Sequence, residues 1–307
     1  MRQIKKILIA NRSEIAIRIS RAATELGFKT VSIYSYEDRF ALHRFKTDES
    51  YLVGSGLGPI QAYLDYKGIV QIAVNSGCDA IHPGYGFLSE NPEFADECAK
   101  YNIIFVGPSP NIMRSLGNKV EAKKTAGKAK VPTIPSTGPL PKDLKKCKDL
   151  AKKIGYPIML KASWGGGGRG MRVIKKETEL ENHINTARRE AKSAFGKDDV
   201  FFEKLIEKAF HVEVQIIGDT HGNIVHLFER DCSLQRRHQK VVERAPAAYL
   251  SDKERNAICE AGVRIGKQVN YSCAGTVEFL MDAKSRDFFF IEVNPRVQVE
   301  HTVTEEI

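Results

Sequence analysis

Residues 276–300 read TVEFLMDAKSRDFFFIEVNPRVQVE and contain two strand-like runs, Thr276–Asp282 and Asp287–Val293, separated by a polar turn. If that turn centres a hairpin, Glu278 and Glu292 are direct cross-strand neighbours on one face of a sheet. Two carboxylates so placed repel each other unless a cation lies between them. Mg²⁺ binds carboxylates together with substrate phosphates, so the hairpin predicts a metal site. The alternative is two glutamates on an exposed sheet face, which would place like charges opposite each other without compensation.

The same strand is predicted to continue beyond the hairpin. Alternation along a strand would then place Asn294, Arg296, Gln298 and Glu300 on one face. Pro295 has no N–H and is tolerated only at a non-bonded strand position. The guanidinium of Arg296 can hold a small oxyanion through two parallel hydrogen bonds, and Glu300 could take a proton from it. The strip therefore predicts an anion site with a base at its end.

A glycine run, Gly165–Gly168, joins two further strand-like segments, Pro157–Ala162 and Met171–Ile174. Glycines let backbone N–H groups approach phosphate oxygens without a Cβ in the way. No Gly-Lys-Ser/Thr opens a helix here, so the loop is not a Walker A motif. A flexible hairpin loop is the alternative for the glycine run alone. Lys161 and Arg169 on either side favour phosphate binding.

Two other polar segments have simpler explanations. Alternation in His211–Ile217 places His211, Glu213 and Gln215 on one face, which a half-buried strand with a solvated polar face explains. Residues 229–240 are rich in charge, and a solvated loop is one interpretation of them. The apolar pair Val241-Val242 follows at once and favours packing against the core, where clustered charge suits an anionic ligand.

The order of elements predicts two domains, at residues 1–117 and 118–307. The first part alternates strand-like and helix-like segments, which indicates a Rossmann-like parallel sheet covered by helices. Its first turn, Ala10–Glu14, lacks GxGxxG, so a dinucleotide there is not supported. The second part is α+β, with an expected lid subdomain at about 131–205 and a second half at 206–307.

Composition excludes several classes of protein. The 307 residues carry a net charge of +9, but aromatic residues are not interleaved with the basic ones, so we expect no nucleic acid partner. Much of the excess of basic residues lies in residues 119–153, at the spacing of a solvated helix face. A basic cleft is explained equally well by small anionic substrates. No apolar run approaches the ~20 residues that span a bilayer, and the amino terminus shows no signal peptide. The six cysteines form no CxxC pair, which is typical of a reducing, cytoplasmic compartment.

Taken together, the motifs resemble the ATP-grasp biotin carboxylases over essentially the whole chain. The segments that carry this resemblance are Ile9–Arg12, His82–Asn91, the glycine loop, Gln235–Lys240 and Gln298–His301. Residues 56–64 and 301–307 are more similar to pyruvate carboxylases than to acetyl-CoA carboxylases. The resemblance implies a Rossmann-like pre-ATP-grasp domain followed by an ATP-grasp domain. It implies ATP- and Mg²⁺- (or Mn²⁺-) dependent carboxylation of biotin with bicarbonate, through carboxyphosphate, as in the first half-reaction of pyruvate carboxylase.

The resemblance also implies a role for each residue at a matching position. ATP is expected at Lys119, Lys161, Gly165, Gly166, Gly167, Gly168, Glu203, Lys204, Ile206, His211, Gln235 and His238. Metal ions are expected at Glu278, Glu292 and Asn294. Bicarbonate is expected at Lys240, Arg296, Gln298, Val299 and Glu300, with Glu300 as the base and Lys240 and Arg296 as the other catalytic residues. Tyr85 is expected near biotin.

The implied partners are a biotin carboxyl carrier domain, a carboxyltransferase domain or subunit, and further copies of the chain. Family members continue for well over a hundred residues beyond Ile307, so the C-terminal part of the fold is expected to be absent. Ser13 stands where the family usually has glycine. Two alternatives stay open: the biotin carboxylase of an acyl-CoA carboxylase, and a nucleotide-binding fragment without turnover of its own.

Overall fold

The structure is a computed structural model that describes residues 3–164, 171–236 and 239–307. The chain divides into two compact units. The first comprises Met1–Arg114, Ser272–Ala274 and Pro295–Val299, and the second comprises Ser115–Tyr271, Gly275–Asn294 and Glu300–Ile307. Among the described residues, no helix is both long enough and apolar enough to cross a membrane.

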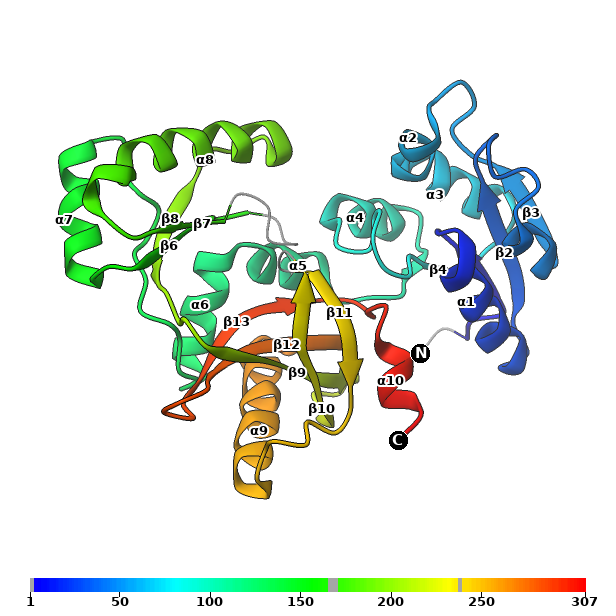
Figure 1. Cartoon of the computed structure of the whole chain (residues 1–307). Helices are drawn as coiled ribbons and strands as arrows, with labels where there is room; N and C mark the ends of the chain where they lie inside the picture. Colours follow the sequence, from blue (N-terminus) through cyan, green and yellow to red (C-terminus); the bar gives the residue numbers. More distant parts are fainter. Residues whose placement is uncertain (1–2, 165–170, 237–238) are drawn as a thin grey trace. The chain divides into compact units, whose positions relative to one another are not determined.

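The first unit is built on a five-stranded parallel sheet (Figure 1). Its strands, in the order β3-β2-β1-β4-β5, are β1 (Lys6–Ile9), β2 (Lys29–Tyr34), β3 (Glu49–Leu52), β4 (Ala80–His82) and β5 (Ile104–Phe105). The helices are α1 (Ser13–Glu25), α2 (Pro59–Leu64), α3 (Tyr66–Asn75) and α4 (Pro92–Lys100), with a 3-10 turn at Leu42–Lys46 and α5 (Pro110–Gly117) at the boundary. Fully buried Leu8, Val31, Ile33 and Ile81 form its core. The predicted Rossmann-like layout is confirmed.

The second unit contains two antiparallel layers. A three-stranded sheet, in the order β7-β6-β8, is formed by β6 (Ile158–Ala162), β7 (Arg172–Ile174) and β8 (Val200–Lys204). The helices α7 (Leu144–Ile154) and α8 (Leu180–Phe195), with a 3-10 turn at Glu177–Glu179, accompany this sheet (Figure 1). Buried Ile158, Leu160 and Phe202 share a core with Cys147 and Ala151 of α7.

The larger sheet of this unit has the order β11-β10-β9-β12-β13. Its strands are β9 (Ala209–Gly218), β10 (Ile224–Arg236), β11 (Gln239–Arg244), β12 (Cys273–Asp282) and β13 (Phe288–Asn294). The helices are α6 (Lys119–Lys128), α9 (Asp252–Gln268) and α10 (His301–Glu305). A capping box of Ser251 and Glu254 starts α9, and a Cβ on Gly262 would lie 3.0 Å from Val214, so this helix packs tightly on β9.

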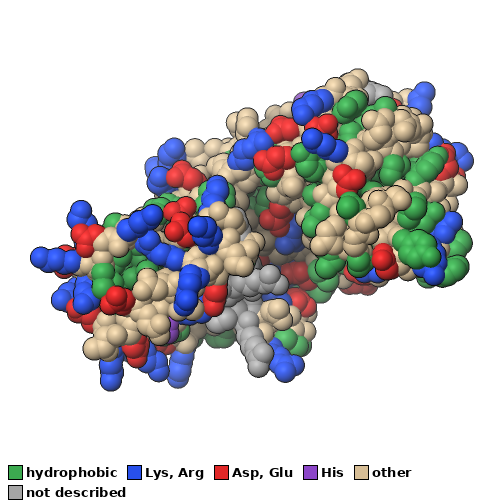
Figure 2. Space-filling model, turned by 90° about the horizontal axis from the view of Figure 1, so that it is seen from above, with side chains coloured by type: hydrophobic (Ala, Val, Ile, Leu, Met, Phe, Trp, Pro, Cys, Tyr) green, Lys and Arg blue, Asp and Glu red, His purple; other side chains and the backbone are tan. Residues whose placement is uncertain are grey.

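Helix α7, beside the smaller sheet, carries several lysines. On α7, Cys147 and Ala151 are buried, whereas Lys145, Lys146 and Lys152 are exposed. Figure 2 shows Lys and Arg side chains on the surface with acidic side chains among them. The basic face of α7 is thus the solvated face that its spacing predicts.

One predicted element is wrong. The last strand ends at Asn294 and does not continue through Glu300, which instead precedes the first residue of α10. Pro295 follows the strand directly and lacks the N–H that another ladder bond needs. Strand alternation therefore does not describe residues 295–300, although Gln298 and Glu300 are buried and Val299 is exposed.

Candidate active site

One lysine of the second unit is shared by three glutamates from different elements. Lys240 on β11 donates to Glu278 on β12 at 2.9 Å and to Glu300, just before α10, at 2.8 Å. It also donates to Glu213 on β9. The exposed fractions of the three glutamate side chains are 6%, 8% and 0%, respectively. In such surroundings a charge must be paired, and this lysine is a common partner for all three.

The burial and the shared cation shift the pKa of each group in this cluster. Burial alone would lower the pKa of Lys240, but the surrounding carboxylates raise it above its usual value. Burial opposes ionisation of Glu278 and Glu300, yet Lys240, joined by His211 at Glu278, holds the pKa of both below the usual range. Burial raises the pKa of Glu213 despite Lys240 and Arg230. Glu278 and Glu300 are therefore ionised at neutral pH.

The predicted hairpin is confirmed: Glu278 on β12 and Glu292 on β13 are direct cross-strand partners. Each carboxylate meets a different cation. Glu278 accepts from Lys240 and from the amide of Asn294 at 2.7 Å, and its other oxygen lies 2.9 Å from His211 Nε2. Glu292 accepts from Lys119 at 2.6 Å. Protein cations thus balance the two facing carboxylates that the sequence singled out.

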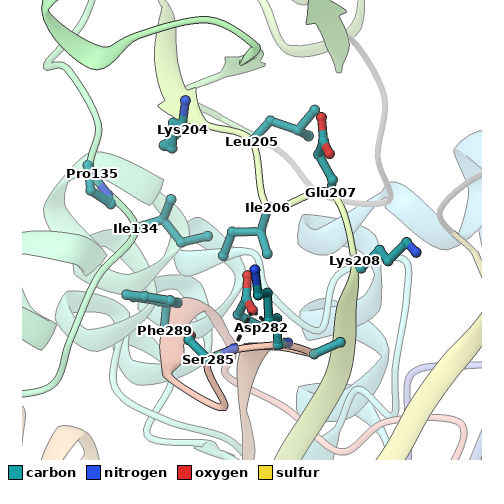
Figure 3. Close-up of a pocket in the computed structure, with 12 residues that line it drawn as sticks. Ile134, Pro135, Lys204, Leu205, Ile206, Glu207, Lys208, Asp282, Ser285 and Phe289 are labelled. Carbon is teal, nitrogen blue, oxygen red and sulfur yellow. Dashed lines mark hydrogen bonds between the residues drawn. The ribbon is translucent and has the colours of Figure 1, made fainter.

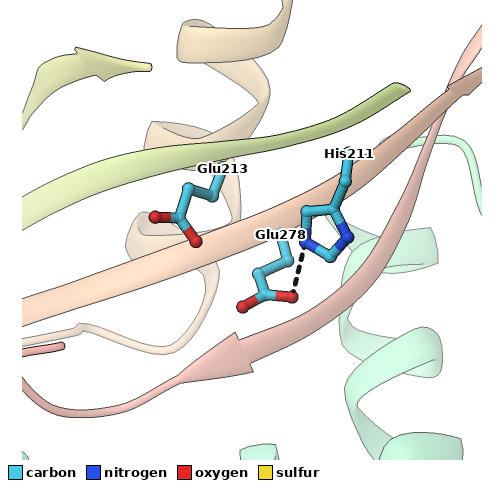
Figure 4. A group of neighbouring side chains, drawn as sticks. All are labelled: His211, Glu213 and Glu278. Atoms are coloured by element: carbon cyan, nitrogen blue, oxygen red, sulfur yellow. Dashed lines mark hydrogen bonds and ion pairs between the residues drawn. The ribbon is translucent and has the colours of Figure 1, made fainter. Parts of the chain in front are cut away.

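The residues present suit a hard divalent cation. Ligand atoms of His211, Glu213 and Glu278 lie within 4.8 Å of one another (Figure 4), and those of Glu213, Cys232 and Glu300 form a second such group. Glu278 belongs to both the first group and the predicted metal set. Carboxylate oxygens are the ligands that Mg²⁺ prefers. The contacts of Lys240 with Glu213, Glu278 and Glu300 show that several carboxylates converge here.

A buried arginine, Arg230, contacts this cluster through Glu213. Arg230 on β10 has no exposed surface and donates to Glu213 at 2.6 Å, to Gln215 at 2.9 Å and to Thr304 of α10 at 2.8 Å. The polar face of β9 is therefore buried, and the expectation that it is solvated is wrong. Sequence reasoning missed Glu213 and Arg230 as members of the site. The alternation that puts Glu213 beside His211 was the available signal.

The charged segment at residues 229–240 is not a loop where the structure describes it. Its described residues lie in β10 and β11, which pair in antiparallel fashion. Asp231 is buried and accepts from Arg244 and Tyr249. The packing against the core holds for the buried residues 229–232, but Val241 and Val242, on which that prediction rested, are 57% and 47% exposed, so it is wrong for the end of the segment. Some of its charged side chains form ion pairs within the second unit, such as Asp231 with Arg244 and Arg230 with Glu213.

Several of the predicted ATP residues are divided between β8 with its neighbour β6 and the strands β9 and β10 of the larger sheet. Lys161 on β6 donates to the carboxylate of Glu203, and the ammonium of Lys204 donates to the carbonyl of Gly155 at 2.8 Å. Gln235 lies 3.0 Å from Nδ1 of His211, which joins these two residues to the Lys240 cluster. Gly165, Gly166, Gly167, Gly168 and His238 lie outside the described residues.

A pocket of about 890 Å³ lies beside the segment that follows β8 (Figure 3). Lys204 and Ile206, both predicted for ATP, line it, and Phe289 of β13 contributes an aromatic wall. Its volume lies in the range of small-molecule sites, about 300–1,000 Å³. The other lining residues are Ile134, Pro135, Leu205, Glu207, Lys208, Asp282, Ala283, Lys284 and Ser285.

The remaining predicted residues belong to the first unit. Tyr85 donates to Glu14 of α1, and the side-chain amide of Asn11 holds the carbonyls of Pro83 and Tyr85 at 2.7 and 2.8 Å. Arg296 donates to Glu90 at 2.5 Å, and Glu90 belongs to the segment His82–Asn91 that also contains Tyr85. Gln298 is buried and Val299 is 62% exposed.

Comparison with known proteins identifies the family. Residues 3–113 match the family described as biotin carboxylase, N-terminal domain, and residues 118–307 match carbamoyl-phosphate synthase L chain, ATP binding domain. A solved biotin carboxylase from Campylobacter jejuni, in complex with an ATP analogue, is 46% identical with a TM-score of 0.95, over 99% of this chain and 68% of that one. The chain belongs to the biotin carboxylase family. This confirms the resemblance and the two-part fold class.

The longer relatives are pyruvate carboxylases. The enzyme of Staphylococcus aureus is 56% identical over 99% of this chain and 26% of its own length. A solved pyruvate carboxylase from Rhizobium etli is 60% identical with a TM-score of 0.95, over 100% of this chain and 27% of that one. The chain therefore spans about a quarter of the length of the curated pyruvate carboxylases that it matches.

Proposed function

We propose that this chain carboxylates biotin with bicarbonate and ATP, as the first half-reaction of a pyruvate carboxylase. The observation that carries the proposal is the ion pair between the ionised carboxylate of Glu300 and Lys240. The ammonium of Lys240 also pairs with Glu213 and Glu278. A base and a cation next to each other suit a small anion that must lose a proton. The S. aureus relative is named a pyruvate carboxylase, and a 46% identical domain from Hydrogenobacter thermophilus 2-oxoglutarate carboxylase is in complex with MgADP and bicarbonate.

The chemistry starts from the poor reactivity of bicarbonate. Glu300 takes its proton, and the resulting oxyanion attacks the γ-phosphorus of ATP while the bond to ADP breaks. Carboxyphosphate then yields CO₂ and phosphate, and the phosphate accepts the proton from biotin N1′ as that nitrogen takes up CO₂. Lys240 neutralises charge on the oxyanion, and Arg296, Gln298 and Val299 are the other proposed contacts for bicarbonate.

Phosphoryl transfer depends chiefly on positioning and on neutralising charge. Lys119 and Lys161 are proposed to hold phosphate oxygens together with Gly165–Gly168. Glu278, Glu292 and Asn294 would hold Mg²⁺ or Mn²⁺, which would neutralise the transferring phosphoryl group. Because Lys119 contacts Glu292 and Lys240 contacts Glu278, both lysines already lie next to the proposed metal ligands.

Adenine is proposed to enter the pocket beside Lys204 and Ile206, where Ile134 and Phe289 offer apolar walls. Glu203 is proposed beside the nucleotide, with His211, Gln235 and His238 near the ribose. Tyr85 is proposed near biotin.

The partners follow from the same chemistry. Biotin would arrive on a carrier domain, and a carboxyltransferase would pass the carboxyl group to pyruvate. Assembly with further copies of the chain is part of the proposal. The proposal of pyruvate as the final acceptor is supported by the pyruvate carboxylases of S. aureus and R. etli, which are 56% and 60% identical to this chain.

ATP hydrolysis with and without bicarbonate and free biotin tests the proposal. We expect turnover that requires bicarbonate, and we expect Glu300→Gln to lower it by about 10²–10⁴-fold, the usual contribution of a general base. Glu306→Gln is a matched control because Glu306 is exposed. Hydrolysis indifferent to bicarbonate, or full activity in Glu300→Gln, would refute the proposal. MgATP that raises the melting temperature without any turnover would favour a nucleotide-binding unit instead.

A further inference from the structure

Helix α6 presents two lysines, one turn apart, to two different sheets. Lys119 and Lys123 are four residues apart and therefore share one face of the helix. Lys119 donates to Glu292 of β13 at 2.6 Å, and Lys123 donates to Glu203 of β8. The helix begins at Asn118, whose side chain accepts from the backbone N–H groups of residues 120 and 121. Its capped first turn places both ammonium groups.

The carboxylate of Glu203 is divided between two lysines. Lys123 donates to Oε1, and Lys161 of β6 donates to Oε2. The exposed fractions of the side chains are 10% for Lys123, 11% for Lys161 and 4% for Glu203. Lys123 also reaches the carbonyl of Ile134 at 3.4 Å. Two buried ammonium groups thus share one carboxylate, which leaves positive charge in excess.

This sharing determines how far the carboxylate of Glu203 neutralises the ammonium of Lys161. If Glu203 paired with Lys161 alone, both carboxylate oxygens would be available to that ammonium and would neutralise it. Because Lys123 occupies Oε1, Glu203 is held in place and divides its charge between the two cations. Burial opposes ionisation of Glu203, but Lys161 and Lys123 hold its pKa below the usual range.

We propose that Lys123 is a positioning residue of the nucleotide site, which holds Glu203 so that the ammonium of Lys161 stays available to phosphate oxygens. This inference rests on the proposed function, which assigns Lys161 to ATP. Lys123 itself lies one helical turn from Lys119, and its ammonium donates to Glu203 and to the carbonyl of Ile134. Replacing Lys123 alone removes one partner of a buried ion pair and is expected to lower stability as well, so the affinity for MgATP, rather than stability, is the measurement that tests the positioning role.

The neighbouring residue supplies a matched control. Lys124 is 63% exposed and pairs with Glu121 on the same helix at 2.7 Å. Lys124→Met removes the same charge from the same helix without touching Glu203. Lys123→Arg keeps the charge, and Lys123→Gln keeps only a hydrogen-bond donor.

The test is the affinity for MgATP, measured by calorimetry on the whole chain. We expect Lys123→Met to weaken binding about tenfold, which corresponds to about 1.4 kcal/mol. Lys123→Arg should restore most of the affinity, and Lys124→Met should change it less than about twofold. In a Lys161→Met background, Lys123→Met should have almost no further effect, because Lys123 acts through Lys161. Lys123→Gln gives the same comparison if the methionine variant does not fold.

Three outcomes are decisive. A Lys123→Met variant that melts at a lower temperature but binds MgATP like the wild type has lost only a structural ion pair, and the inference is then wrong. A tenfold loss that persists after Lys161 is removed refutes the route through Lys161. A folded wild-type chain that binds no MgATP overturns the proposed function, and this inference with it.

Discussion

Replacing Lys240 by methionine tests the central ion cluster most directly. The ammonium is the shared partner of Glu213, Glu278 and Glu300, whose side chains are at most 8% exposed. Removing one partner of a buried ion pair costs about 3–5 kcal/mol, because the remaining charge stays buried without compensation. Arg230 still holds Glu213, so we expect a loss of about 3–5 kcal/mol at pH 7 rather than a multiple of it.

The loss should depend on pH in a defined direction. The pKa values of Glu278 and Glu300 lie below the usual range in the folded protein. Their ion pairs therefore stabilise the fold above the unfolded pKa of about 4.3, and this contribution disappears as the pH falls through the folded values. Glu213, with its raised pKa, contributes with the opposite sign. The difference between wild type and Lys240→Met should therefore be largest near pH 7 and shrink below about pH 4.

Urea denaturation followed by circular dichroism at pH 7 and pH 3 measures both effects. Lys253→Met is the control, since Lys253 is exposed on α9 and its loss should stay within about 0.5 kcal/mol. A loss below 1 kcal/mol at pH 7, or one that is equal at both pH values, would mean that Lys240 does not hold the buried carboxylates together.

Two further predictions concern the first unit. Ser13 has a φ of 59°, a conformation that glycine adopts without strain, so Ser13→Gly should stabilise the protein by up to about 1 kcal/mol; an unchanged melting temperature would argue against strain there. Asp38 accepts from Arg12 at 2.5 Å and from Tyr63 at 2.7 Å, so Asp38→Asn should cost about 2–3 kcal/mol in urea denaturation. A cost no larger than that of an exposed substitution would contradict this pairing.

The sequence alone predicted the features that depend on short-range regularity. Alternation over a few residues and one polar turn placed Glu278 opposite Glu292, and the structure has that pair, although a register shift between Glu278 and Phe279 that the sequence did not predict lies between the pair and the turn. The alternating strands and helices of the first unit could also be predicted, because the apolar residues of each element recur with the period of a strand or of a helix. The φ of 59° at Ser13, where the family usually has glycine, was not predicted from the sequence.

Tertiary structure decided which charges meet. Glu213 and Lys240 are 27 residues apart in the chain, and only the pairing of β9, β10 and β11 brings them together. Whether a polar strand face is solvated depends on what covers it, and Arg230 of the adjacent strand covers the face of β9. Lys123 and Glu203 are 80 residues apart in the chain, and they meet only because the tertiary structure brings α6 to β8. Alternation within one segment carries no information about such partners, since they belong to other segments.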